Sequence, residues 1–224
     1  GEVWTYKNTI HIDGVSGKAS DTDTYRSYKS FEKRVSANSD QDESGYQSGD
    51  QTYQYGKLSG KNLHYQLVVQ TAAEDDADIV ITDTLPENTT FQTNCVEIGM
   101  DEGAPDKVNA LKGATATVDY DETTRKLTIT ISGYNKNKQH KFRILYKVSV
   151  SDDPRWKNPS VDKLTYTNTA TWGELTETTT TTVTRKVEQV KKTGWQDPGN
   201  DRKLHYRVVI NPAGDDLSAA KDHA

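Results

Sequence analysis

Hydrophobic and polar residues alternate with a period of two along most of the chain. The clearest runs lie at 63–69, 127–131 and 142–150, where every second residue is aliphatic or aromatic. Successive side chains of a β-strand point to opposite faces, so this alternation predicts strands with one buried face. No long segment keeps a helical stripe of apolar residues. The pattern therefore predicts an all-β fold.

Turn-forming residues separate these runs. Glycine, proline, asparagine and aspartate gather at 58–62, 85–88, 99–106, 121–124 and 152–154. About seven strands divided in this way are typical of an immunoglobulin-like β-sandwich rather than of a parallel sheet. We therefore expect two packed antiparallel sheets.

An internal repeat indicates how the chain is divided. The run Leu63-His-Tyr-Gln-Leu-Val-Val recurs as Leu204-His-Tyr-Arg-Val-Val-Ile, and Trp4-Thr-Tyr-Lys-Asn-Thr resembles Leu164-Thr-Tyr-Thr-Asn-Thr. The alternative is chance similarity between short strands, but the paired features keep the same order about one domain apart. We predict that residues 1–24 close a preceding module, 25–184 form one complete module, and 185–224 open the next.

Three polar residues occupy positions where the strand pattern requires apolar ones. They are Lys33, Asp83 and Asn168, and each has apolar residues two positions before and after it. Residues two apart share a strand face, so each of the three is predicted to point into the core. Threonines at 165, 167, 169 and 171 fill the other face of the last of these strands. Because an isolated buried charge is costly, we expect the three side chains to meet.

Burial of these groups predicts a chemistry. Desolvation lowers the pKa of a lysine and raises that of a carboxyl, so we expect a neutral Lys33 amine beside a protonated Asp83. A neutral amine is a nucleophile. It can attack the side-chain carbonyl of Asn168 while Asp83 polarises that carbonyl and moves protons, which forms an amide and releases ammonia. The alternatives are a buried ion pair with no covalent bond, and a solvent-exposed Lys33.

Three short runs carry a family resemblance. Phe31-Glu-Lys-Arg-Val, Ile81-Thr-Asp-Thr-Leu-Pro and Tyr166-Thr-Asn-Thr-Ala-Thr resemble the Asp-type isopeptide-forming immunoglobulin-like domains of Gram-positive adhesins and pilins, in particular the collagen-adhesin A-region type. The resemblance covers about 25–184. It implies that Lys33 and Asn168 are joined and that Asp83 promotes this reaction, once per molecule.

The repeat extends the resemblance to the flanking segments. Asn8 lies in the position of Asn168, and either Lys191 or Lys192 lies in that of Lys33. The spacing from Val190 favours Lys192, and we predict Asn8 and Lys192 as cross-link residues of the flanking modules. A polar insertion at 36–62 departs from the compact pattern, so the limits of the first strand stay open.

Composition narrows the possible partners. The 224 residues include 27% charged ones and a net charge of −5, which provides no broad basic surface, so nucleic acid is not an expected partner. A single cysteine, Cys95, excludes an internal disulfide framework. No apolar run is long enough to cross a bilayer and no signal peptide begins the chain, so membrane insertion is not expected. We expect an excised piece of an extracellular cell-surface protein, anchored to the cell wall through a region outside this chain.

Other candidate sites are weaker. Asp40, Asp42 and Ser44 have the spacing of calcium ligands, but Gln51 stands where a bidentate glutamate belongs and no helices flank the segment, which favours a solvated loop. We therefore predict no metal and no cofactor. Motifs of a turnover enzyme are also missing.

The sequence leaves three classes of function. The first is a structural stalk or adhesin module whose partners are neighbouring modules of the same protein. The second is an adhesin domain that binds a host matrix protein or a glycan. The third is a carbohydrate-processing or carbohydrate-binding β-domain, which would require several tryptophans close together on one sheet face. Trp156, Trp172 and Trp195 are the candidates for a ligand surface, although core or interdomain packing is the more common use of such residues.

Overall fold

Strands dominate the part of the chain that the structure describes. The computed structural model describes residues 3–11, 18–38, 45–73, 77–101, 111–158, 161–186 and 190–210. Its helical elements within these ranges are short 3-10 segments: η2 (Tyr55–Lys57), η3 (Ser59–Lys61), η4 (Thr93–Cys95) and η6 (Pro154–Lys157). None of the described helices is long and apolar enough to pass through a membrane.

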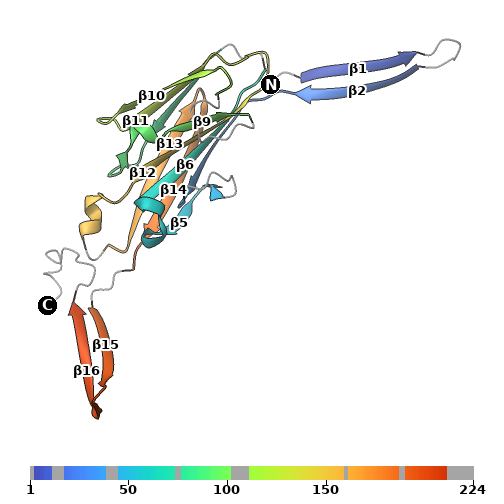
Figure 1. The fold of residues 1–224 in the computed structure, drawn as a ribbon. Coiled ribbons are helices and arrows are strands. Elements are labelled where there is room, and N and C mark those ends of the chain that lie inside the picture. The colour runs from blue at the N-terminus through green and yellow to red at the C-terminus, as the bar shows by residue number, and fades with distance from the viewer. Residues whose placement is uncertain are drawn as a thin grey trace.

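The described residues between 30 and 184 form two sheets that pack face to face (Figure 1). The first sheet has the strand order β4-β3-β6-β12-β8, with β9 also paired to β12, and we call it the Lys sheet. Its strands are β3 (Ser30–Ser36), β4 (Gln47–Ser48), β6 (Asn62–Gln70), β8 (Thr90–Phe91), β9 (Glu97–Met100) and β12 (Lys141–Ser149). The pairings within this sheet are antiparallel.

The second sheet has the order β10-β11-β7-β13-β14-β5, and we call it the Asn sheet. Its strands are β5 (Gln51–Gln54), β7 (Ile79–Thr84), β10 (Thr115–Asp121), β11 (Lys126–Ser132), β13 (Lys163–Trp172) and β14 (Leu175–Thr184). One continuous apolar core lies between the two sheets and takes alternate residues from strands of both. The all-β, immunoglobulin-like sandwich predicted from the sequence is thus confirmed.

The insertion at 36–62 has a structural role that the sequence did not reveal. Its strand β4 extends the Lys sheet beside β3, whereas β5 pairs in parallel with β14 at the edge of the Asn sheet. The Tyr53 hydroxyl on β5 also donates a hydrogen bond to the backbone carbonyl of Val35 at 3.1 Å. The insertion therefore crosses from one sheet to the other near β3. The turn signal at 99–106 begins inside β9, which continues to Met100; a turn follows at Asp101, and residues 102–106 lie outside the described part of the chain.

Two hairpins lie outside the sandwich. Strands β1 (Val3–His11) and β2 (Lys18–Arg26) form one two-stranded sheet, and β15 (Val190–Asp197) and β16 (Asn200–Ile210) form another. Figure 1 draws each hairpin apart from the body of the sandwich. The proposed division into modules at 24 and 184 stays a prediction.

Candidate functional site

A buried ion pair joins the two sheets. Lys33 lies on β3 of the Lys sheet, and its Nζ is 2.6 Å from Oδ2 of Asp83 on β7 of the Asn sheet. The exposed fraction is 1% for Lys33 and 0% for Asp83. The alternative in which Lys33 faces solvent is therefore wrong.

Tyr146 on β12 connects this pair to Asn168 on β13. The phenol oxygen of Tyr146 accepts hydrogen bonds from Lys33 Nζ at 2.6 Å and from Asn168 Nδ2 at 2.9 Å, and the phenol donates one to Asp83 Oδ2. Lys33 Nζ and Asn168 Nδ2 therefore both contact the Tyr146 oxygen. The distance between these two nitrogens cannot exceed the sum of the two hydrogen-bond lengths, about 5.5 Å. We call Lys33, Asp83, Tyr146 and Asn168 the inter-sheet cluster.

Strand register explains why these four side chains meet. In the Lys sheet, Lys33 pairs with Leu67, and Leu67 in turn pairs with Ile144 on β12. Tyr146 lies two residues beyond Ile144 and so points to the same face. In the Asn sheet Asp83 pairs with Ala170, two residues from Asn168. Each polar side chain therefore points into the core from a strand whose neighbouring residues are apolar.

Sequence reasoning brought three of the four cluster residues together and missed the fourth. Tyr146 was recognised only as part of an alternating strand, because a tyrosine in an apolar phase is indistinguishable from an ordinary core residue. Its ring does pack in the core, stacked on Tyr65 with ring centroids 5.3 Å apart. The signal that could have found it is the need for a polar partner at any buried phenol.

Burial sets the proton affinities in the cluster. It is the main cause that lowers the pKa of Lys33, and the carboxylate and hydrogen bond of Asp83 offset this only in part. Burial also raises the pKa of Tyr146 well above its usual value of 10.0, and the negative charge of Asp83 adds to this effect. The lysine is therefore biased towards the free amine, and the phenol keeps its proton.

Several polar atoms around the cluster lack a hydrogen-bond partner among the described residues. They include Oδ1 of Asp83, Oδ1 of Asn168 and the hydroxyls of Tyr65, Thr179 and Thr181. Thr179 is the cross-strand neighbour of Asn168. Unsatisfied buried groups are costly, and their concentration at one place is typical of a functional site rather than of a core built only for stability.

This arrangement is suited to amide formation. It holds the desolvated Lys33 amine no more than about 5.5 Å from the amide nitrogen of Asn168, with a carboxyl and a phenol as the proton-carrying groups. Attack by the amine on the amide carbon needs a free lone pair and a route for protons, and the cluster provides both. No group of three or more potential metal ligands occurs within the described ranges.

A second buried carboxylate lies at the end of the sandwich. Asp153 accepts hydrogen bonds from the backbone nitrogen of Arg155 at 2.9 Å, from the Arg155 guanidinium at 2.6 Å and from the Tyr166 hydroxyl at 2.8 Å. Burial acts to raise the pKa of Asp153, but the hydrogen bonds from Arg155 and Tyr166 outweigh it and hold that pKa below its usual value of 3.8. This group caps η6 and attaches it to β13, two residues before Asn168 on that strand.

The flanking hairpins place the remaining predicted residues. Lys192 on β15 pairs with Val208 on β16 and lies over the Tyr206 ring, with its Nζ 4.7 Å from the ring centroid. In the sequence repeat Val208 corresponds to Leu67, the partner of Lys33. Lys192, and not Lys191, therefore has the register of Lys33.

Asn8 and the calcium candidates complete the predicted set. Asn8 is exposed on β1 and pairs with Asp21 on β2. Asp21 thus has the position relative to Asn8 that Thr179 has relative to Asn168. Asp40, Asp42 and Ser44 lie outside the described residues.

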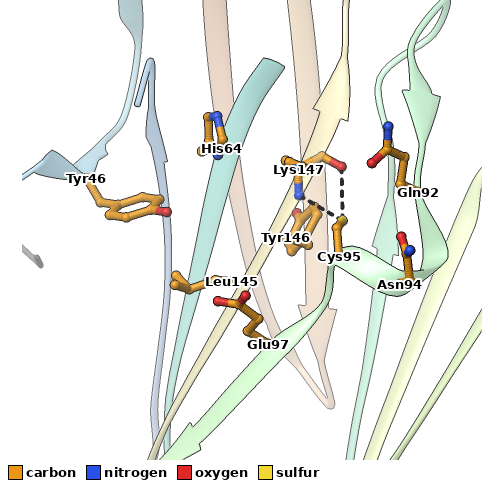
Figure 2. A pocket seen from close by; sticks show the side chains of 9 residues that line it. All are labelled: Tyr46, His64, Gln92, Asn94, Cys95, Glu97, Leu145, Tyr146 and Lys147. Carbon is orange, nitrogen blue, oxygen red and sulfur yellow. Dashed lines mark hydrogen bonds between the residues drawn. The ribbon is translucent and has the colours of Figure 1, made fainter. Parts of the chain in front are cut away.

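A pocket of about 460 Å³ is lined by residues of β6, β9, β12 and η4 (Figure 2). Its lining residues are Tyr46, His64, Gln92, Asn94, Cys95, Glu97, Leu145, Tyr146 and Lys147. The Cys95 thiol accepts a hydrogen bond from the backbone nitrogen of Lys147 at 3.4 Å and lies 3.5 Å from its carbonyl oxygen (Figure 2). Because burial raises the pKa of Cys95, the thiolate is disfavoured, and the residue has a packing role.

Comparisons with known proteins give structural similarities only. No family model matches the chain, and no curated protein matches it in sequence. The major pilin subunit of Bacillus cereus is 13% identical, with a TM-score of 0.45 over 88% of this chain and 52% of that one. The pilus backbone protein of Streptococcus pneumoniae is 10% identical, with a TM-score of 0.41 over 64% of this chain and 31% of that one.

A collagen adhesin is also similar in structure. The adhesin of S. aureus is 14% identical, with a TM-score of 0.37 over 86% of this chain and 58% of that one. The chain thus covers less than two thirds of each of these three proteins. Two of these three solved structures are of pilins and one is of a collagen adhesin.

Proposed function

We propose that this chain is a structural module of a bacterial cell-surface stalk or adhesin, whose sandwich is closed by an amide bond between Lys33 and Asn168. The observation that carries the proposal is the fully buried inter-sheet cluster. It contains the amine, the amide and a carboxylate, placed together between two sheets. Asp83 promotes the bond, and the reaction occurs once in each molecule.

A simple structural ion pair is a poor account of the same cluster. Removing two charges from water costs several kcal/mol per ion, and a buried pair is often no better for stability than apolar residues of the same volume. The unpaired atoms at Asp83, Asn168 and Thr179 increase that cost. Amide formation would consume the buried amine, so the core would no longer contain an ionisable lysine.

The bond has consequences for stability. It would close a loop from residue 33 to residue 168, and the chain-entropy relation for cross-links gives about 5 kcal/mol for a loop of this length.

The bond also has a mechanical consequence. It would join β3, the first long strand of the sandwich, to β13, the second-to-last strand of the sandwich in sequence order. A pulling force applied along a string of modules would then pass from β3 to β13 through a covalent bond. The remaining strands would carry little of the load, which suits a stalk on a cell surface exposed to shear and proteases.

The ligand-binding alternative has less support among the described residues. Trp156 and Trp172 are buried in the core, with exposed fractions of 6% and 7%, so they are not available to a ligand. Trp195 is 50% exposed, but its ring stacks on His205 in the β15–β16 hairpin. A host matrix protein or a glycan as partner therefore stays a separate hypothesis, together with the cell-wall location.

Intact-mass measurement under denaturing conditions tests the proposal. We expect the purified protein to be lighter than its sequence by one ammonia. Lys33→Ala and Asn168→Ala should each restore the full mass, and Lys29→Ala, on the same segment but outside the cluster, should leave the deficit unchanged. A wild-type protein of full mass would overturn the proposed bond.

A further inference from the structure

We propose that Tyr146 is a catalytic residue of the cross-linking reaction and carries the proton that the departing nitrogen of Asn168 needs. The inference rests on the proposed amide bond and adds a residue that neither the sequence motifs nor the repeat indicated. Its basis is a connection in the inter-sheet cluster. Among the described residues Tyr146 is the only side chain that hydrogen-bonds to Lys33, Asp83 and Asn168 together.

Proton movement is the central requirement of the reaction. When a neutral Lys33 amine attacks the amide carbon of Asn168, one hydrogen stays on the new amide nitrogen. The other must leave Nζ, and one proton must reach Nδ2 so that it departs as ammonia rather than as an amide anion. The net change is one proton moved from Nζ to Nδ2.

Asp83 can perform only the first half of this transfer. Its Oδ2 lies 2.6 Å from Lys33 Nζ, so the carboxylate is placed to take the proton from the attacking amine. The described contacts include no hydrogen bond between Asp83 and Asn168, and Asp83 Oδ1 has no partner within the same set. The carboxyl therefore needs an intermediary to deliver a proton to the leaving group.

Tyr146 has the position of that intermediary. Its oxygen already bonds to Asp83 Oδ2, and it lies 2.9 Å from the leaving nitrogen Nδ2. As the carboxyl of Asp83 passes its new proton to the phenol oxygen, the phenol passes its own proton to Nδ2. The C–N bond to Nδ2 then breaks and ammonia leaves. Asp83 returns to a carboxylate and Tyr146 to a neutral phenol, so neither is consumed.

The proton affinity of the phenol fits this role. Burial and the adjacent Asp83 raise the pKa of Tyr146 well above its usual value, so the hydroxyl proton is present throughout the neutral pH range. A relay of this kind requires a group that accepts and donates at the same oxygen, and a hydroxyl is such a group. General acid–base groups of this type contribute roughly 100-fold or more to a rate.

The neighbouring Tyr65 provides a matched control. It is buried to the same extent, its ring stacks on that of Tyr146 at 5.3 Å, and Lys33 Nζ lies at a similar distance, 5.1 and 5.3 Å, from the two ring centroids. The Tyr65 hydroxyl interacts with Asn168 and Thr181, but among the described residues it makes no hydrogen bond to Lys33 or to Asp83 and so does not connect them to Asn168. Removing the hydroxyl of Tyr65 or of Tyr146 thus preserves the ring packing in both cases and interrupts the proposed relay in only one.

The test is the rate of ammonia loss, followed by intact mass in samples of newly synthesised full-length chain quenched in acid. We expect Tyr146→Phe to slow cross-linking by about 100-fold and Tyr65→Phe to change the rate by less than about threefold. A fluorinated tyrosine at 146, which keeps the ring and lowers the phenol pKa, should alter the rate even if the phenylalanine variant folds poorly. A merely structural hydroxyl would not produce this change.

The outcomes separate the two proposals. If the wild type loses ammonia and both Tyr146→Phe and the fluorinated variant do so at the wild-type rate, the relay is wrong and the proposed bond stands. If the wild type keeps its full mass, the bond and the relay both fail. A large effect at Tyr146 with little effect at Tyr65 supports the relay.

Discussion

Lys33 Nζ lies 2.6 Å from Asp83 Oδ2 in the core of the sandwich, and the two residues come from different sheets. This contact places a charged or potentially reactive amine where only apolar side chains are normally found. Its neighbour Tyr146 extends the contact to Asn168.

The ion pair itself should be measurable once the bond is blocked. In an Asn168→Ala background, Asp83→Ala leaves Lys33 buried without a carboxylate, and we expect the free energy of unfolding to fall by a further ~3–5 kcal/mol. Urea denaturation followed by circular dichroism measures this difference. Glu87→Ala, which breaks an exposed pair with Arg125, is the control and should cost less than about 1 kcal/mol. Equal losses in the free energy of unfolding for the two substitutions would show that the buried ion pair stabilises the fold no more than an exposed one.

The rate of cross-linking should depend on pH with a definite sign. Only the neutral amine of Lys33 has a lone pair for attack, so the rate should rise as pH increases and level off above the pKa of that amine. Because burial lowers this pKa from its usual value of 10.5, the plateau should begin at a lower pH than an exposed lysine would give. Quenched samples analysed by intact mass give the profile. A midpoint at or above 10.5 would contradict the lowered pKa.

Asp153 should make the protein sensitive to acid. Its pKa is lower in the folded state than in the unfolded chain, so its contribution to stability is full above the unfolded value, near 3.8, and is lost as pH falls through the folded value. In a Lys33→Ala background, we expect Asp153→Asn to reduce the free energy of unfolding at neutral pH by about 1–3 kcal/mol. It should also flatten the decline below pH 3.8. Urea titrations at several pH values measure the free energy of unfolding of both proteins. The same decline at low pH with and without Asp153→Asn would contradict this role of Asp153.

Lys192 should be the cross-link residue of the following module. Its pairing with Val208 reproduces the pairing of Lys33 with Leu67, whereas Lys191 points to the other face of β15. In a longer chain that contains the complete next module, Lys192→Ala should abolish one further loss of ammonia. Lys191→Ala is the matched control and should leave the mass deficit intact. The reverse result would mean that the repeat is aligned incorrectly.

Most of what could be predicted from the sequence came from the period-two alternation of apolar residues along the strands. The alternation of apolar residues was sufficient to place Lys33, Asp83 and Asn168 inside the sandwich, because a one-residue shift would expose the whole apolar face of a strand. The same periodicity could not separate Tyr146 from the core residues around it. A phenol satisfies an apolar pattern through its ring, and its hydroxyl partner comes from another strand.

The insertion illustrates a second limit of the sequence. Strand β5, with the sequence Gln-Thr-Tyr-Gln, has little apolar alternation and joins its sheet by parallel pairing at an edge. Such pairing depends on backbone hydrogen bonds to β14, which no periodicity of side chains reveals. The contact from Tyr53 to the Val35 carbonyl is similarly a tertiary feature.

Tandem mass spectrometry of a tryptic digest can locate the proposed bond between Lys33 and Asn168. Trypsin cannot cleave after a lysine whose amine has become an amide, so the cluster should yield one branched species. We predict that residues 30–34 are joined to residues 164–185, with the link at Lys33 and Asn168 and the mass of one ammonia missing. Recovery of 30–33 and of 164–185 as separate peptides of full mass would contradict the account.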